Sequence, residues 1–192
     1  MTLDITQPLR LAVGSHKKGS GTGCAMNVIS WLMGDEEITD SPTCAAYIPT
    51  TLIQFVNDRI GFLAGDELNS RIDGSRITYL KAKHALPLLE IAFGVIGTAG
   101  QNVGNYRWIV EINKKLEEHS LRYNEGLDGS CMLWRNCGSQ YGGWQISNIP
   151  EDYLALAHFG VETFRELAGL DEKKMPTAFE VDLALKDMAV KA

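Results

Sequence analysis

The stretch GSHKKGSGTGCAMN, residues 14–27, joins a glycine-rich loop to a cysteine and an apolar segment. Backbone N–H groups of such a loop can turn towards an anion, and the free N–H groups at a helix start add positive potential. The stretch is not a P-loop, because Ser20 and Gly21 stand where Lys and Ser/Thr are required. It is not a dinucleotide fingerprint either, because Gly19, Gly21 and Gly23 are spaced two apart. An anion-binding loop and a plain surface loop are both open interpretations.

Cys24 stands at or near the start of the helix predicted after this loop, where the helix dipole lowers the pKa of a thiol. With His16 as its base and the loop N–H groups as an oxyanion site, Cys24 is a candidate nucleophile. The alternative is a packed, inert thiol, because free cysteine is among the most buried residue types. No residue is therefore assigned a catalytic role.

The cysteines do not follow a zinc-binding pattern. His16, Cys24 and Cys44 are 8 and 20 residues apart, and Cys131 and Cys137 are 6 apart. Structural zinc sites use closer pairs, of the C-x2–4-C and H-x3–5-H types. We expect no metal site and no cofactor.

Two acidic stretches are expected to have different surroundings. The run of residues 35–37 follows a predicted helix end, where acids are usually solvated. Asn57 and Asp58 lie at the end of an apolar helical face, and Asp58 is a candidate for a hydrogen bond to the glycine-rich loop. Such a bond would be structural support rather than catalysis.

The apolar spacing predicts a mainly α fold in a single globular domain, residues 1–192. Residues 9–13 are a short apolar run of extended or buried type, and Thr22 and Gly34 are the expected cap and stop of the first helix. Pro49 and Pro87 suggest that the second and third helices begin near them. The expected helices cover residues 24–33, 50–63, 86–96, 103–119, 152–168 and 177–189.

A glycine-rich, aromatic segment separates the helical core, residues 1–119, from the C-terminal helices, residues 150–192. Residues 120–149 have little helical period, so turns or a hairpin are expected there. Trp134, Tyr141 and Trp144 of this segment offer either a stacking surface or a cover for a core edge.

Composition narrows the classes of partner. The chain has 192 residues, 45% of them hydrophobic, and a net charge of -6, so it has no general electrostatic attraction to nucleic acid. Its apolar runs are too short for a membrane span, and its first ten residues lack the apolar stretch of a signal peptide. We expect a cytoplasmic protein with reduced thiols, no membrane partner and an undetermined oligomeric state.

Six short motifs in order resemble a family of small uncharacterised actinobacterial and bacteriophage proteins. The family pattern is GSH, C-x-M-E, a helix, G-E, S-D-H-P-x-C and N-D, and the likeness covers about the first half of the chain. Asn27 replaces the family's Glu and Ser41 its His, so a general base or metal ligand at those positions would be missing. The resemblance implies a bacterial or phage cytoplasm but no reaction. The motifs here are GSH 14–16, CAMN 24–27, GDE 34–36, TDSPTC 39–44, ND 57–58 and IGT 96–98.

These observations favour a non-enzymatic binding protein of phage-accessory type. Its ligand would be a small anion, with nucleotide-like chemistry among the candidates, or a host protein. The alternative is the thiol enzyme with Cys24 and His16, and a purely structural, self-associating protein is a third class. The candidate ligand-binding residues are Ser15, His16, Gly21, Thr22, Gly23, Cys24, Asp40, Asn57 and Asp58.

Overall fold

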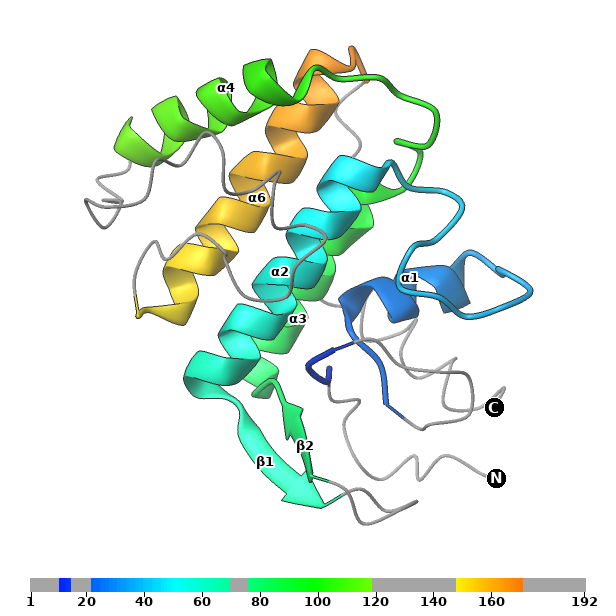
Figure 1. Ribbon diagram of the computed structural model, residues 1–192, viewed down its shortest axis with the longest axis vertical. Helices are drawn as coiled ribbons and strands as arrows, with labels where there is room; N and C mark the ends of the chain where they lie inside the picture. The colour runs from blue at the N-terminus through cyan, green and yellow to red at the C-terminus, as the bar shows by residue number, and fades with distance from the viewer. Residues whose placement is uncertain (1–10, 15–21, 70–75, 119–147, 171–192) are drawn as a thin grey trace.

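The computed structural model describes residues 11–14, 22–69, 76–118 and 148–170, and it is mainly α, as predicted (Figure 1). Strands β1 and β2 form an antiparallel hairpin between α2 and α3. Within the described ranges, no helix combines the length and the apolar character needed to cross a membrane. The elements are α1 (Ala25–Leu32), α2 (Tyr47–Ala64), β1 (Asp66–Asn69), β2 (Arg76–Tyr79), α3 (Ala82–Ala92), the 3-10 helix η1 (Phe93–Val95), α4 (Asn105–Glu118) and α6 (Pro150–Leu167).

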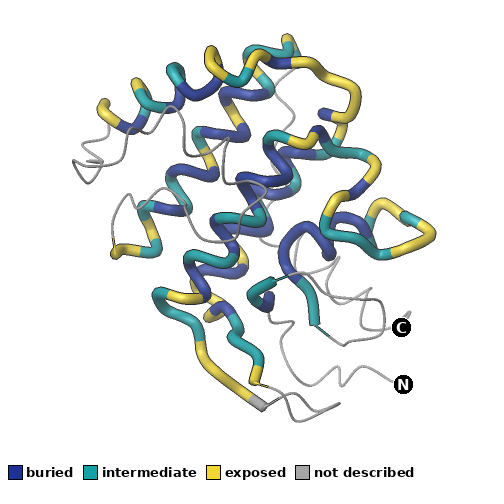
Figure 2. The backbone as a smooth tube through the Cα atoms, in the orientation of Figure 1, coloured by how far each residue is buried: buried dark blue, intermediate teal, exposed yellow. Residues whose placement is uncertain are grey.

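Helix α6 lies against α2, α3 and α4, and the buried sides of these helices face one another (Figure 2). At Gly160, α6 approaches α2 closely, since a Cβ atom there would overlap the Leu52 side chain of α2. Trp108 of α4 is also buried at this point, and its Nε1 donates a 2.7 Å hydrogen bond to the Gly160 carbonyl oxygen. The missing side chain of Gly160 therefore allows three helices to meet.

Helix α1 confirms the predicted position of the first helix, but its cap differs from the prediction. The N-cap is Cys24, not Thr22, and the Asn27 side chain accepts a hydrogen bond from the Cys24 N–H. The predicted stop is confirmed, because the chain turns at Gly34 with a φ of 75°. A glycine at this position adopts the left-handed conformation without the strain that a side chain would add.

The predicted starts of α2 and α3 are wrong, because both prolines lie inside their helices. Helix α2 begins at Tyr47, and Pro49 occupies its first turn, where a missing N–H costs little. Pro87 is the sixth residue of α3, well past the first turn. It removes one backbone hydrogen bond there, and the buried residues Leu88 and Leu89 show that packing of α3 offsets the loss.

A small extended unit covers one end of the helices. The expected extended run near residues 9–13 is confirmed for its described part, since the Val13 N–H donates to the Thr78 carbonyl and the Leu80 N–H to the Leu11 carbonyl. On its other side, the Ala12 N–H donates to the Gly23 carbonyl. The β1–β2 hairpin was not predicted from the sequence. The hairpin expected at residues 120–149 and the helix at 177–189 lie outside the described residues, apart from 148 and 149.

Candidate functional site

Asn57 and Asp58 of α2 join both ends of the glycine-rich loop to the helical core. The Nδ2 atom of the fully buried Asn57 donates to the Ala12 carbonyl oxygen at 2.8 Å, and its Oδ1 accepts from the Ala25 N–H at 3.3 Å. Oδ1 of Asp58 accepts from the Gly14 N–H at 2.8 Å. The hydrogen bond expected between Asp58 and the loop is therefore present, and its role is structural.

The two stems of the loop also contact each other. Leu11 and Gly23 form a parallel bridge, in which the Ala12 N–H donates to the Gly23 carbonyl at 2.9 Å. Gly61 of α2 lets the first stem approach, because a Cβ atom at that position would overlap the Val13 side chain. The stems on either side of residues 15–21 are therefore held at a fixed separation beside α2.

The first N–H groups of α1 already have acceptors within the protein. The Cys24 N–H donates to Asn27 Oδ1 at 3.0 Å, and the Ala25 N–H donates to Asn57. The N–H groups of Met26 and Asn27 point to the Cys24 sulfur. An anion at this helix start would have to displace these partners, so the helix end itself offers little for the anion-binding interpretation.

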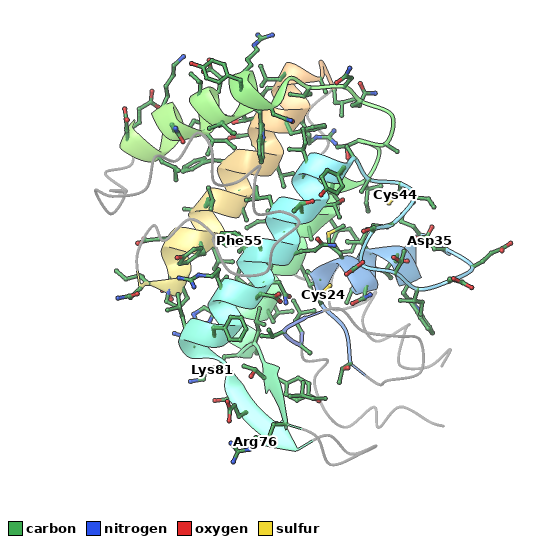
Figure 3. The ribbon with its side chains drawn as sticks, viewed as in Figure 1. Cys24, Asp35, Cys44, Phe55, Arg76 and Lys81 are labelled. Carbon is green, nitrogen blue, oxygen red and sulfur yellow. The ribbon has the colours of Figure 1, made fainter. Side chains whose placement is uncertain are left out.

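Cys24 is buried at the inner end of α1, next to α2 (Figure 3). Desolvation raises the pKa of its thiol to about 11, against the opposing effect of the Asn27 and Met26 N–H groups, and the charges of Asp40 and Asp58 raise it further. At this pKa only about one thiol in ten thousand is ionised at pH 7. This burial favours the packed, inert thiol over an activated nucleophile.

Asp35 has a structural role that the sequence analysis missed, because the acidic run was expected to be solvated. Its carboxylate accepts hydrogen bonds from Ser30 Oγ at 2.7 Å and from Thr43 Oγ1 at 2.6 Å. The Thr43 and Ser30 hydroxyls lower the pKa of the Asp35 carboxyl. The Thr39 N–H also donates to Ser30 Oγ, so Asp35 fixes the loop between α1 and α2 (Figure 3). The hydroxyl residues at positions 30, 39 and 43 were the sequence feature that could have indicated this role of Asp35.

Two of the motifs that carried the family resemblance meet at the start of α2. The Cys44 carbonyl oxygen accepts hydrogen bonds from the Gly97 and Ala99 N–H groups at 3.0 and 3.2 Å. Thr98 Oγ1 accepts from the Ala46 N–H at 2.8 Å. The TDSPTC and IGT motifs are therefore joined by backbone contacts that position α2.

The predicted site residues that the structure describes come from three segments. Thr22, Gly23 and Cys24 lie on the second stem beside Asn57 and Asp58. Asp40 lies in the loop before α2, where its carbonyl oxygen accepts from Gln54 Nε2 at 2.6 Å and its charge acts on the Cys24 thiol. In the described part of the chain, no three His, Cys, Asp or Glu side chains are arranged to hold a metal ion. The predictions for Ser15, His16, Gly21, Cys131, Cys137, Trp134, Tyr141 and Trp144 lie outside the described residues.

No protein-family model, curated protein or solved structure matches the chain. The resemblance to actinobacterial and bacteriophage proteins stays a prediction.

Proposed function

We propose that the protein is a non-enzymatic binding protein whose binding element is the glycine-rich loop, residues 14–23. The observation that carries this proposal is the attachment of both stems to α2 through Asn57 and Asp58. Binding by a loop costs conformational entropy, and fixed stems lower that cost. A buried asparagine bonded to both stems fixes the chain on either side of the loop.

The chemistry of the described groups favours binding over catalysis. Cys24 is a neutral thiol at pH 7, and the Asn57 and Asp58 side chains are already used in backbone hydrogen bonds. A nucleophile needs a base and an orienting group within hydrogen-bond reach. The thiol enzyme with Cys24 and His16 is therefore the weaker of the two functions.

We infer that the partner is a protein, which would be a host protein for a phage-type chain. A small anion at the α1 start would compete with Asn57 and with the Cys24 sulfur for the N–H groups, and the Asp58 carboxylate would repel it. A protein partner can contact the loop side chains without displacing these bonds. The sequence places the cationic residues Lys17 and Lys18 in the loop.

The test places a photoactivatable side chain in the loop, at Ser20, and in a control protein at Lys114, which is exposed on α4. We expect one partner to crosslink from position 20 alone, and a peptide of residues 12–25 to reduce its yield. The double variant Lys17→Ala/Lys18→Ala should lose the partner without a change in the unfolding midpoint. Equal crosslinking from both positions, or none from position 20, would reject the loop as the binding element.

Calorimetry with ATP, GTP and inorganic phosphate separates the two ligand classes. Heat of binding that is lost in the double lysine variant would replace the protein partner with a small anion. Turnover or rapid alkylation that depends on both Cys24 and His16 would instead support the thiol enzyme.

A further inference from the structure

We propose that Arg59 forms a binding site for an oxyanion, of carboxylate or phosphate type, between α2 and α6. The proposal does not depend on the function proposed for the glycine-rich loop. It depends on a cluster of three side chains: Phe55 and Arg59 of α2, and Tyr153 of α6.

Aromatic contacts fix the position of the Arg59 side chain. Residues four apart share one face of a helix, so Phe55 and Arg59 lie together on α2. The ring of Phe55, on the α6 side of α2 (Figure 3), meets the ring of the buried Tyr153 edge to face, with centroids 6.1 Å apart. The Arg59 guanidinium carbon lies 5.6 Å from the Tyr153 ring centroid, and Nη2 donates to Tyr153 Oη at 3.3 Å. A cation within ~6 Å of an aromatic centroid is attracted to the ring.

The guanidinium group has donors that this contact does not use. Arginine carries five N–H donors, and the Nε atom of Arg59 is buried without a hydrogen-bond partner. A buried donor without an acceptor costs free energy, and so does a partly buried cation without a counter-charge. The Nη atoms of the half-buried side chain keep N–H groups that this contact does not use, and an external acceptor can bind those, whereas the buried Nε only reports on the site.

Two other described cations have partners of a kind that is not seen for Arg59 among the described residues. Lys115 pairs with Glu162 and Glu166, and Arg165 donates to the carbonyl oxygens of Gly94 and Ile96. Within the described residues, no carboxylate forms an ion pair with Arg59.

The acid next to Arg59 in the sequence does not neutralise it. Asp58 accepts hydrogen bonds from the Gly14 N–H and from Asn57 Nδ2, so its carboxylate serves the loop stem. The counter-charge of Arg59 is accordingly assigned to a ligand.

The shape of the group defines the ligand class. The planar fork of a guanidinium matches two oxygen atoms of one carboxylate or phosphate, which a lysine ammonium cannot match in the same way. The contacts with Tyr153 limit the positions that the fork can take. The site should therefore prefer a planar or tetrahedral oxyanion to chloride.

The experiment uses the full-length protein and the nuclear magnetic resonance signal of the Arg59 Nε–H group, assigned in the wild-type protein by through-bond correlation to the Arg59 backbone. Inorganic phosphate and acetate are titrated separately at constant ionic strength, with sodium chloride as the reference. We expect the Nε–H signal to shift with saturation for at least one oxyanion and not for chloride. A response to phosphate alone assigns a phosphate-type ligand, and a response to acetate assigns a carboxylate.

The matched variants are Arg59→Lys and Arg76→Lys, since Arg76 is an exposed arginine that pairs with Glu67. Oxyanion affinity should fall at least about ten-fold in Arg59→Lys and stay unchanged in Arg76→Lys. Two results would overturn the proposal. The first is an Arg59 signal that no oxyanion shifts, as expected if a carboxylate of the same chain already binds the guanidinium. The second is an oxyanion affinity in Arg59→Lys equal to that of the wild-type protein. The signal of the wild-type chain decides the first point even if the variant does not fold.

Discussion

Substitution of Asn57 by alanine should destabilise the protein mainly because two buried backbone groups lose their hydrogen-bond partner. The change removes the donor to the Ala12 carbonyl oxygen and the acceptor for the Ala25 N–H. Because residue 57 is fully buried, water does not replace these partners readily. Each buried group left without a partner costs about 1–3 kcal/mol. The 3.3 Å bond to Ala25 is the longer of the two, so we expect a total loss of about 2–4 kcal/mol.

The measurement is urea denaturation at pH 7, followed by circular dichroism. With an m value of about 2 kcal/mol/M, the midpoint should fall by about 1–2 M. Asn102→Ala is the matched control, because Asn102 is exposed, and it should change the free energy of unfolding by less than about 0.5 kcal/mol. Hydrogen exchange should also accelerate at the Ala12 and Gly14 amides in Asn57→Ala.

Asn57→Asp gives the reasoning a second, pH-dependent test. The aspartate keeps an acceptor for the Ala25 N–H, but it directs a second acceptor at the Ala12 carbonyl oxygen beside Asp58. Burial and the neighbouring carboxylate should raise the pKa of this new carboxyl. The loss of stability relative to wild type should therefore shrink as the pH falls and the carboxyl becomes a donor. A midpoint of Asn57→Ala within about 0.5 kcal/mol of wild type, or a pH-independent defect in Asn57→Asp, would refute the anchoring role.

Three further predictions concern packing and titration. Gly160→Ala should lower the free energy of unfolding by about 1–3 kcal/mol, measured by urea denaturation. Gly104→Ala, which places a Cβ atom in open space, should lower the free energy of unfolding by less. Burial raises the pKa of Cys24 to about 11, so the stability that its neutral thiol contributes should be complete below about pH 9 and be lost towards pH 11. Cys24→Ala should remove this loss of stability at alkaline pH. Alkylation of the Cys24 thiol near pH 7 should be roughly 300-fold slower than alkylation of a cysteine of pKa 8.5. Since hydroxyl donors lower the pKa of Asp35, the stability that its carboxylate contributes should be present above pH 3.8 and be lost as the pH falls through its folded value. Asp35→Asn should weaken this acid dependence, as measured by urea midpoints between neutral and acidic pH.

Local sequence signals predicted the helices but not the starts of α2 and α3. Apolar spacing located α1, α2, α4 and α6, because one face of each is buried against the others. Pro49 and Pro87 misplaced the starts of α2 and α3, since a proline marks where a helix can begin but does not require it to begin there. The β1–β2 hairpin gave little signal, because DELN and RITY are four-residue strands with polar and exposed positions.

The candidate site was predicted as a set of residues and not as a geometry. Asn57 and Asp58 were named correctly as groups near the loop, but the bonds from Asn57 to Ala12 and Ala25 span 45 and 32 positions. No local pattern encodes such pairs. The cap of α1 was misplaced for a related reason: Thr22 is the better intrinsic cap, and Asn27 together with Asn57 makes Cys24 the observed one.

The use of Asn57 and Asp58 as anchors separates two kinds of substitution that activity measurements alone would confuse. A change at Asn57 should reduce both stability and partner binding, because it releases the stems as well as the loop. A change at Lys17 or Lys18, between the stems, should reduce partner binding alone if the loop contacts the partner directly. Loss of binding that tracks the free energy of unfolding across both kinds of variant would mean that the loop only supports the fold. Loss of binding without loss of stability in the lysine variants would identify the loop as the contact surface.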